Sequence, residues 1–403
     1  MQKKAVGLSP EASMHVSRVG AAVVTSWTSS KAIDDGLKAS SAVYSCVTMI
    51  AKSFAQIPWY AARNKPNSEG VEILEDHPLT ELFRKPHPFM SRSALMERFC
   101  MHILLAGNGI FYMAFADGLP YYLWPLDPDL ISPVPDPNGY LRFYEASQAF
   151  KYKSGIEKIP IEKIIHHQLT NPRNPYWGLS PLEANAVVVD TENDAINWNR
   201  NSLKNRAMPS GVMAVNDEHL IDDQYDDMAA KMKKHFEGPE NAYKPFLLGA
   251  DAKWFPITMN ALEMDFLGGR EFTRSEICGI FGVDPALIGS EKASTYANKR
   301  EARKAMWMQT LIPFANAVCQ TFDMQLAPHY GEDIVTTYRI NHIRAVADYI
   351  MDSVEAMQKM WGMGVPFNTV KQVFNMPMAD IEGGDVPYIP TSMMPADDMK
   401  LDV

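Results

Sequence analysis

The chain has 403 residues, of which 46% are hydrophobic and 21% are charged. These values are ordinary for a globular protein of two to three domains, and they exclude collagen-like, mucin-like and wholly disordered chains. Lysine and arginine number 38 against 48 aspartates and glutamates, so the net charge is −10, the wrong sign for a surface that simply adheres to nucleic acid.

Four cysteines lie far apart, at Cys46, Cys100, Cys278 and Cys319, with no CxxC pair. This spacing argues against a disulfide framework or a zinc-thiolate site and favours reduced thiols in a cytosolic fold. No run of about 18 apolar residues occurs, so we expect no membrane span.

The N-terminal part is expected to be an arm followed by a helix and a hairpin. Residues 1–40 are rich in serine, alanine and glycine and predict a loosely held arm. Apolar residues then recur at helical spacing from Val43 to Ile57, and Pro58 ends the helix. Two strands, Trp59–Ala62 and Val71–Leu74, flank a turn-rich segment and predict a hairpin.

A second amphipathic helix is predicted from about Ser91 to Ala106, because Gly107 suits a left-handed C-terminal cap. Short β-rich runs separated by Asp-Gly and Asn-Gly turns follow. They are Ile110–Phe115, Tyr121–Trp124, Leu130–Val134, Tyr140–Tyr144 and Ile164–His167. The first 170 residues therefore read as one α+β domain.

A long helix is predicted from Pro181 to Arg206. Ser180 serves as its N-cap and Glu183 completes a capping box. Polar residues interrupt its apolar stripe, which suits a helix packed against neighbours in an assembly.

The second half of the chain continues this helical pattern around a small insert. We expect a strand–helix–hairpin insert over 207–258 and a long helix over 260–283. A loop and a third long helix, from Asn298 to Leu326, follow, and Pro313 should kink this helix. Two shorter helices over 341–361 and 367–374 and a fraying acidic tail complete the chain.

The search for catalytic chemistry finds little. There is no phosphate-binding GxxxxGK[ST] loop, no GxGxxG after a strand and no HExxH, so we expect neither an enzyme nor a cofactor. Ser180 resembles the front of a nucleophile elbow, but the closing glycine is missing, which favours a helix cap. His166 and His167 alternate faces on a strand and are expected to be structural. Asp222, Asp223, Asp226 and Asp227 occupy the first turns of a predicted helix, where they complement its dipole better than they form a metal site.

One charged segment stands out. From Glu291 to Lys304 five cations face two anions, a local charge of +3 in an acidic chain. Lys299 and Arg300 are expected in the first turn of a helix, where cations are unfavourable. Two interpretations stay open: a solvated helix start with acids nearby, or contact with a polyanion across the preceding loop.

Several stretches, taken together and in order, resemble tailed-bacteriophage portal proteins of the short form typical of phages with long non-contractile tails. They are AVYSCVTMIAKSFAQIPWY, HPLTELFRKPHPFMS, LLAGNGIFYMAF, YWGLSPLEAN, GPENAYKPFLLGADAKW, EICGIFGVDPALIG, TYANKREA with TLIPFANAV, and WGMGVPFNTVKQVF followed by GGD. The resemblance covers about residues 41–385.

The resemblance implies an α+β portal-type protomer and a dodecameric ring at one capsid vertex, the channel for packaging and ejecting double-stranded DNA. It divides the chain into an N-terminal arm (1–40), an α/β wing (41–180), a first stem helix (181–206), a clip (207–258), a second stem helix (259–283), a tunnel loop (284–298), a kinked helix that returns to the wing (299–340), a helical crown (341–385) and a flexible tail (386–403). The implied partners are the large terminase, the major capsid protein and a head-completion adaptor. The implied locations are the virion and, during assembly, the host cytoplasm.

Two sets of contact residues follow from this division. The tunnel loop and the helix after it are expected to contact DNA through Lys292, Ser294, Thr295, Lys299 and Arg300. The clip is expected to contact its partners through Tyr225, Lys233, Phe236 and Tyr243. Three alternatives stay open: a portal of a gene transfer agent or defective prophage, a hydrolase that uses Ser180, and a scaffold or adaptor without a DNA channel.

Overall fold

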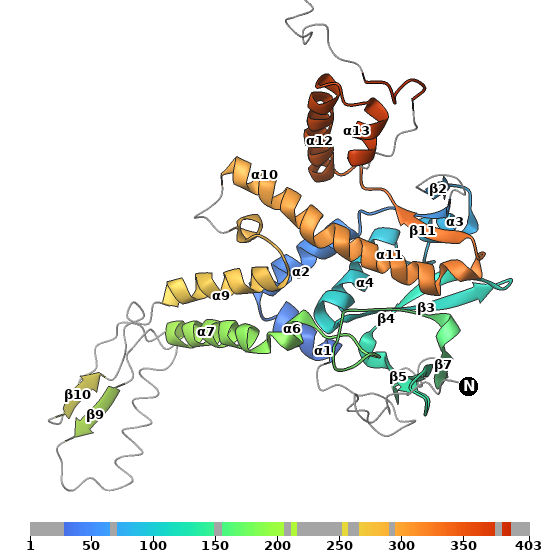
Figure 1. Ribbon diagram of the computed structural model, residues 1–403. Coiled ribbons are helices and arrows are strands. Elements are labelled where there is room, and N and C mark those ends of the chain that lie inside the picture. The colour runs from blue at the N-terminus through green and yellow to red at the C-terminus, as the bar shows by residue number, and fades with distance from the viewer. Residues whose placement is uncertain are drawn as a thin grey trace, which may run out of the picture.

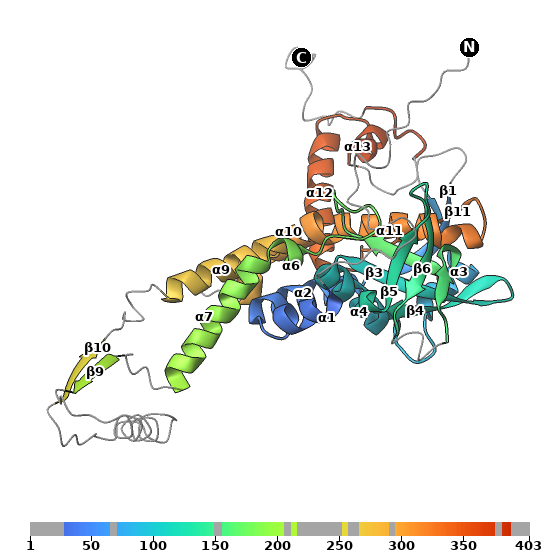
Figure 2. The same cartoon turned by 90° about the horizontal axis from the view of Figure 1, so that it is seen from below.

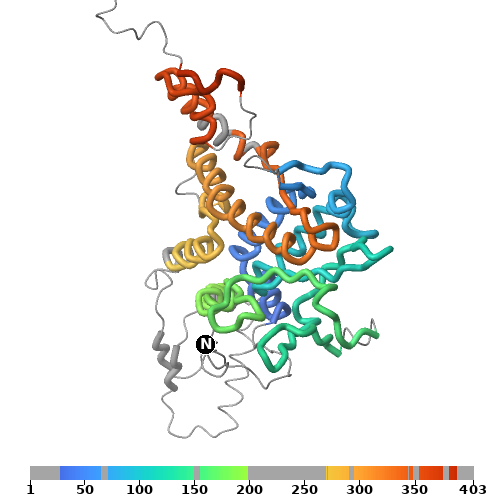
Figure 3. Tube along the Cα trace, turned by 45° about the vertical axis from the view of Figure 1, so that its right-hand side comes forward, coloured from blue at the N-terminus to red at the C-terminus, as the bar shows by residue number. Residues whose placement is uncertain are grey.

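The protein is described by a computed structural model that covers residues 28–64, 71–148, 155–204, 211–215, 252–256, 266–289, 295–374 and 381–387. An α+β body carries a pair of helices, α7 and α9, that projects from it, with the strands β9 and β10 beyond their ends (Figures 1 and 2). A second helical unit, α12 and α13, stands on the body next to α10, as the trace in Figure 3 also shows.

The helical elements are α1 (Ser29–Lys31), η2 (Ala32–Leu37), α2 (Ser41–Phe54), α3 (Pro78–Arg84), α4 (Arg92–Ala106), η3 (Pro128–Leu130), η4 (Ile161–Lys163), α6 (Pro181–Ala184), α7 (Ala186–Lys204), α9 (Phe266–Ile280), η6 (Pro285–Ile288), α10 (Tyr296–Ala305), η8 (Met306–Leu311), α11 (Ile312–Gln325), η9 (Ala327–His329), α12 (Arg344–Gly362) and α13 (Phe367–Val373). The strands are β1 (Trp59–Asn64), β2 (Val71–Leu74), β3 (Asn108–Ala116), β4 (Leu119–Leu126), β5 (Ile131–Pro135), β6 (Leu141–Ala146), β7 (Lys158–Pro160), β8 (Ile164–Gln168), β9 (Gly211–Val215), β10 (Ala252–Pro256) and β11 (Ile334–Tyr338).

The two helices predicted in the first hundred residues are confirmed and form the centre of the core. The Ser40 hydroxyl caps α2 by accepting a hydrogen bond from the Val43 N–H at 3.2 Å. Apolar residues at helical spacing, from Val43 to Phe54, make the buried face of α2, which packs against α4. The helix α4 ends at Gly107 with φ 75°, the left-handed cap that the sequence predicts, and the chain turns directly into β3.

Three antiparallel sheets surround these helices, in the orders β4-β3-β8, β5-β6-β7 and β11-β1-β2. The predicted hairpin of β1 and β2 is confirmed, and so is the β3–β4 turn, where Asp117 and Gly118 have φ 50° and 83°. The pairing of β1 with β11 was not predicted. It joins Trp59 to Tyr338, and no local sequence pattern links strands so far apart.

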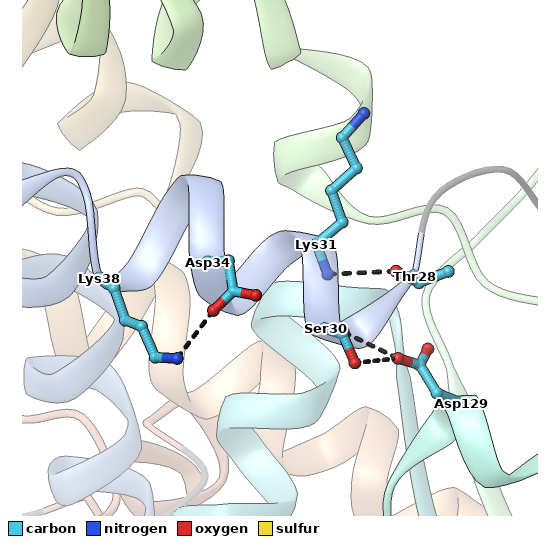
Figure 4. A network of polar contacts seen from close by, with 6 residues as sticks. All are labelled: Thr28, Ser30, Lys31, Asp34, Lys38 and Asp129. Carbon is cyan, nitrogen blue, oxygen red and sulfur yellow. Dashed lines mark hydrogen bonds and ion pairs between the residues drawn. The ribbon is translucent and has the colours of Figure 1, made fainter.

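The expectation of a loosely held arm over 1–40 is wrong for residues 28–40. These residues form α1 and η2, and Ala32 is fully buried. The Asp129 carboxylate accepts hydrogen bonds from Ser29 N at 2.7 Å, Ser30 N at 2.8 Å and Ser30 Oγ at 2.7 Å, and so it holds the start of α1 from another part of the chain. Figure 4 shows its contact with Ser30. The Thr28 hydroxyl caps α1 locally by accepting from Lys31 N at 3.1 Å, and Asp129, about a hundred positions later, adds contacts that the local pattern does not reveal.

The single helix predicted over 181–206 is in fact two. Asn185, at φ −126° and ψ 29°, separates α6 from α7, and its side chain donates to the Pro181 carbonyl at 2.9 Å. A side-chain bond of this kind gives the backbone an alternative to the helical pattern.

The sequence predicts that Pro313 kinks the helix, and the structure has a π-helical turn, η8, which ends two residues before this proline. Proline has no N–H to donate and crowds the carbonyl four residues earlier, and a widened turn relieves that clash.

Candidate functional site

The projecting pair of helices is the most distinctive feature of the described chain. The helix α7 leads away from the body and α9 returns to it, and the two pack side by side (Figures 1 and 2). The antiparallel strands β9 and β10 lie beyond their outer ends and pair from Ala252 with Val215 to Pro256 with Gly211.

Three polar contacts, of which the first is buried, fix the root of this projection to the body. The Ser40 hydroxyl donates to the carboxylate of Glu192, which lies on α7 and is only 4% exposed. One residue further, the Asn193 amide donates to the Asp35 carbonyl at 2.7 Å. On α9, Arg274 donates to the Ile288 carbonyl, which ties the helix to the segment that follows it.

A second polar network holds the point where the chain enters α6. Asn108 accepts a hydrogen bond from Gly178 N at 2.7 Å and from His166 Nε2 at 3.0 Å, and the other nitrogen of His166 bonds the Tyr144 hydroxyl at 2.8 Å. Because the amide oxygen of Asn108 accepts, Nε2 carries the proton and the Tyr144 hydroxyl donates to Nδ1. Burial, together with the neighbouring His167, lowers the pKa of His166 to about 3, so this imidazole is neutral.

Ser180 is a helix cap. It is fully buried, donates to the Leu105 carbonyl at 2.5 Å, and accepts from Leu182 N at 3.1 Å and Glu183 N at 3.4 Å. The Glu183 carboxylate in turn accepts a hydrogen bond from the backbone of Ser180, which completes the predicted capping box, although burial of this carboxyl raises its pKa overall. A hydroxyl committed in this way has no access to a substrate.

His166 and His167 are both buried and structural, as predicted. His167 bonds Thr321 of α11 through Nδ1 at 2.8 Å, and burial lowers its pKa to about 4. Among the described residues, no group of three or more histidine, cysteine, aspartate or glutamate side chains is placed to hold a metal ion. Within the same residues, no helix combines the length and the apolar character needed to cross a membrane.

The charged residues of α7 and α9 are of both signs. Four exposed acidic side chains lie on these helices, namely Asp190, Asp194, Glu271 and Glu276, and the helices also contain Arg200, Lys204, Arg270 and Arg274. The helix α10 carries four cations against one carboxylate, a charge of +3, and Lys299, Arg300 and Arg303 are exposed on it.

The start of α10 is less unfavourable for its cations than the sequence predicts. The helix α10 begins at Tyr296, not Asn298, because the Thr295 hydroxyl caps it by accepting from Asn298 N at 3.3 Å. Lys299 therefore ends the first turn, where its N–H already bonds the Thr295 carbonyl at 3.1 Å, and Arg300 begins the second turn. Since the dipole effect fades within one turn, its cost to these cations is smaller than expected.

The remaining predicted contact residues lie outside the described residues. They are Lys292 and Ser294 in the loop and Tyr225, Lys233, Phe236 and Tyr243 in the insert. The structure therefore brings together Thr295, Lys299 and Arg300 alone. Sequence reasoning missed Asn108, Glu192 and Arg274, which hold the projection in place. The only signal for them was local: Asn108 lies between the two glycines of the α4 cap.

Comparison with known proteins decides the family. The family model described as phage portal protein matches residues 41–365, which is most of the chain. This chain belongs to the phage portal protein family. It is 30% identical over 309 residues to an uncharacterized protein of Rickettsia bellii (strain RML369-C), with 76% of this chain and 79% of that protein covered. It is also 22% identical over 378 residues to the portal protein of Enterobacteria phage HK97, which covers 91% of this chain and 85% of the HK97 protein.

Two solved structures of gene transfer agent particles contain chains similar to this portal protein. The neck of the empty particle, computed with C6 symmetry, gives a TM-score of 0.67 at 25% identity, and the neck of the native particle, computed with C12 symmetry, gives 0.63 at 25% identity. Each comparison covers 90% of this chain and 97% of the other. The mixed helix and sheet fold of this chain thus matches chains in the necks of gene transfer agent particles, and the portal family is a structural one.

Proposed function

We propose that twelve copies of this chain form a ring at one vertex of a capsid and that double-stranded DNA passes through its channel during packaging and ejection. The observation that carries the proposal is the extensive similarity to a neck chain arranged with twelvefold symmetry. A ring built by identical head-to-tail contacts needs no active site, and it needs helices with exposed faces, such as α7 and α9.

The projecting pair then takes the role of the stem, with α7 and α9 as its two helices. The other assignments follow the chain: residues 1–40 as the arm, 41–180 as the wing, 207–258 as the clip, 284–298 as the tunnel loop, 299–340 as the return to the wing, 341–385 as the crown and 386–403 as the tail. The body and the helix pair described above support this division because the stem leaves the body and returns to it (Figure 1).

The charge distribution suits a channel in which DNA must slide. Neutralising many phosphates gives tight, salt-dependent binding, which would hold the DNA in place. Twelve chains of charge −10 give −120 per ring, and the exposed residues of α7 and α9 include the acidic Asp190, Asp194, Glu271 and Glu276. A wall that repels phosphates, with cations confined to one level, keeps the DNA centred and mobile.

The cations of that level would come from the tunnel loop and α10. In this proposal Lys292, Ser294, Thr295, Lys299 and Arg300 touch the DNA backbone, each weakly, since one exposed charge contributes about 1 kcal/mol or less. Lys299→Gln with Arg300→Gln should leave ring formation intact but lower the yield of fully packaged particles. Lys163→Gln, an exposed cation on η4, is the matched control. Normal full-length packaging by the double variant would remove these cations from the channel.

The clip would dock the large terminase during packaging and the head-completion adaptor afterwards. Substituting Tyr225, Lys233, Phe236 and Tyr243 together by alanine tests this. We expect the variant to form rings but to lose terminase in a pull-down from a lysate that contains both proteins. Undiminished terminase binding would contradict the assignment.

Electron microscopy of the purified protein tests the ring itself. Twelve chains of 45.2 kDa give 542 kDa, and we expect a ring of about that mass with a central hole. A uniform 45 kDa species at micromolar concentration and at several salt concentrations would refute the proposal.

The gene transfer agent necks favour a second candidate of the same kind, a portal of a gene transfer agent in place of a phage. Sequencing the DNA inside released particles separates the two. A phage particle encloses copies of the phage genome, while a gene transfer agent particle encloses random fragments of host DNA. In both cases the ring would lie at a capsid vertex in contact with the major capsid protein, after assembly in the host cytoplasm.

A further inference from the structure

Two cysteines far apart in the chain meet at the root of the projecting helix pair. Cys46 lies on α2 in the core and Cys278 lies on α9, 232 residues later. Their Sγ atoms are 3.9 Å apart, and the Cys46 thiol donates toward Cys278. Both side chains are fully buried. Of the other two cysteines, Cys100 is buried and Cys319 bonds Thr336.

The surroundings make these two thiols unequal. The hydrogen bond from Cys46 lowers the pKa of Cys278, and the positive charge of Arg274, one turn earlier on α9, lowers it further against the effect of burial. The same hydrogen bond and burial raise the pKa of Cys46. Arg274 is held close by its bond to the Ile288 carbonyl, and its buried Nε has no hydrogen-bond partner among the described residues. Cys278 is therefore the nucleophilic member of the pair.

We propose that Cys46 and Cys278 are a redox pair that closes to a disulfide in an oxidising environment and locks α9 to α2. Closure requires the two sulfur atoms to approach from 3.9 Å to about 2.05 Å, a movement that side-chain rotation and a small helix shift supply. The bond would hold the root of the stem and, through Arg274, the segment that leads to the tunnel loop. It would also close a very long loop, the case in which a cross-link restricts the unfolded chain most.

A peroxide suffices as the oxidant. The Cys278 thiolate attacks one oxygen of hydrogen peroxide, the O–O bond breaks, and the sulfur becomes a sulfenic acid while hydroxide leaves and takes a proton. The Cys46 thiol then attacks this sulfur and gives up its proton, and the S–O bond breaks as the departing hydroxide takes that proton and leaves as water. Two thiols and one peroxide thus give one disulfide and two waters. Because both sulfur atoms are buried, the reaction waits for a local opening of α9 and is slow.

The cysteine pair matters because the redox surroundings of a particle change once, when it is released. Chains that assemble in a cytoplasm keep reduced thiols, whereas released particles meet oxidants with no reducing system. A ring that stays adjustable during assembly would stiffen afterwards. This timing rests on the proposed function, but the chemistry of the pair does not.

The test uses the purified full-length protein treated with hydrogen peroxide and then alkylated under denaturing conditions. We expect the number of alkylated cysteines to fall from four to two, the intact mass to fall by about 2 Da before alkylation, and proteolysis to release a peptide joining Cys46 to Cys278. The oxidised protein should melt about 5 °C higher than the reduced protein, and a reductant should reverse the shift. Cys46→Ser should lose all four signals, while Cys100→Ser should keep them.

Several results would overturn the proposal. One is a protein that keeps four alkylatable cysteines although its methionines are oxidised, since the oxidant has then acted without closing the pair. Another is a cross-link that forms only above the melting temperature, and a third is a disulfide that joins other cysteines. None of these depends on whether the chain forms a ring, so a failure here is distinct from a failure of the portal proposal.

Discussion

Acid is expected to destabilise this fold through the two buried histidines at the end of β8. Burial holds the pKa of His166 at about 3 and that of His167 at about 4, against an ordinary value of 6.5 in the unfolded chain. Below pH 6.5 the unfolded chain therefore binds protons that the folded chain refuses. The free energy of unfolding falls with pH by about 1.4 kcal/mol per pH unit for each histidine, until the pH reaches the folded pKa.

The magnitude at pH 5 follows from the 1.5 units that separate it from 6.5. Each histidine then contributes a loss of about 2 kcal/mol, or about 4 kcal/mol for the pair, relative to pH 7. The structural reason is clear for His166, because both of its nitrogens are already satisfied in the neutral form. A second proton would face the Tyr144 hydroxyl and displace the hydrogen that this hydroxyl donates.

Urea unfolding followed by tryptophan fluorescence at pH 7, 6 and 5 measures this effect. His166→Gln keeps a donor near Asn108, so it should fold, lose about 1 kcal/mol at pH 7, and lose about 2 kcal/mol less than the wild type between pH 7 and pH 5. His342→Gln, at an exposed position, is the control and should keep the wild-type pH dependence. An unchanged pH dependence in His166→Gln would refute the reasoning.

Three further predictions concern the packing of the body. Gly178→Ala should destabilise the protein by about 3 kcal/mol or more in thermal unfolding, because the new Cβ would lie 2.1 Å from the Gly107 carbonyl oxygen. Gly269→Ala is the control and should be tolerated, because its Cβ meets nothing within 4 Å. Equal melting temperatures of the two variants would contradict this prediction. Ser180→Ala should lower stability by about 1–2 kcal/mol yet leave packaging unaffected in particles that assemble, and a loss of packaging by folded rings would revive a chemical role for the hydroxyl. Asp129→Ala should speed amide hydrogen exchange across residues 28–40 at least tenfold while α4 keeps its protection, and unchanged exchange would show that α1 is held by other contacts.

Where one local rule governs a segment, the sequence predicted it well. The cap and buried stripe of α2, the left-handed end of α4 at Gly107, the capping box at Ser180 and Glu183, and the turn at Gly118 all depend on a few adjacent residues. The ordered motifs along the chain also predicted membership in the portal family, and the comparison confirmed this prediction.

The candidate site was less predictable, for a related reason. The sequence indicated a basic helix start after the loop, and α10 is there, but its first residue moved because Thr295 competes successfully as a cap. A window of charges does not reveal which hydroxyl accepts a backbone hydrogen bond. The extent of the dipole effect on Lys299 and Arg300 depends on that one bond.

The sequence by itself thus determined the helices α2 and α4, the β1–β2 and β3–β4 hairpins, the absence of recognisable catalytic motifs and membership in the portal family. Only the tertiary structure decided that Asp129 holds the start of α1, that β11 pairs with β1, that Glu192 is buried against Ser40, and that Cys46 meets Cys278. Periodicity and capping are local properties that neighbouring residues express in any context, whereas these contacts join residues about a hundred to nearly three hundred positions apart. They form only after the core has brought helices and strands together, and nothing in either partner's own surroundings marks it for the other.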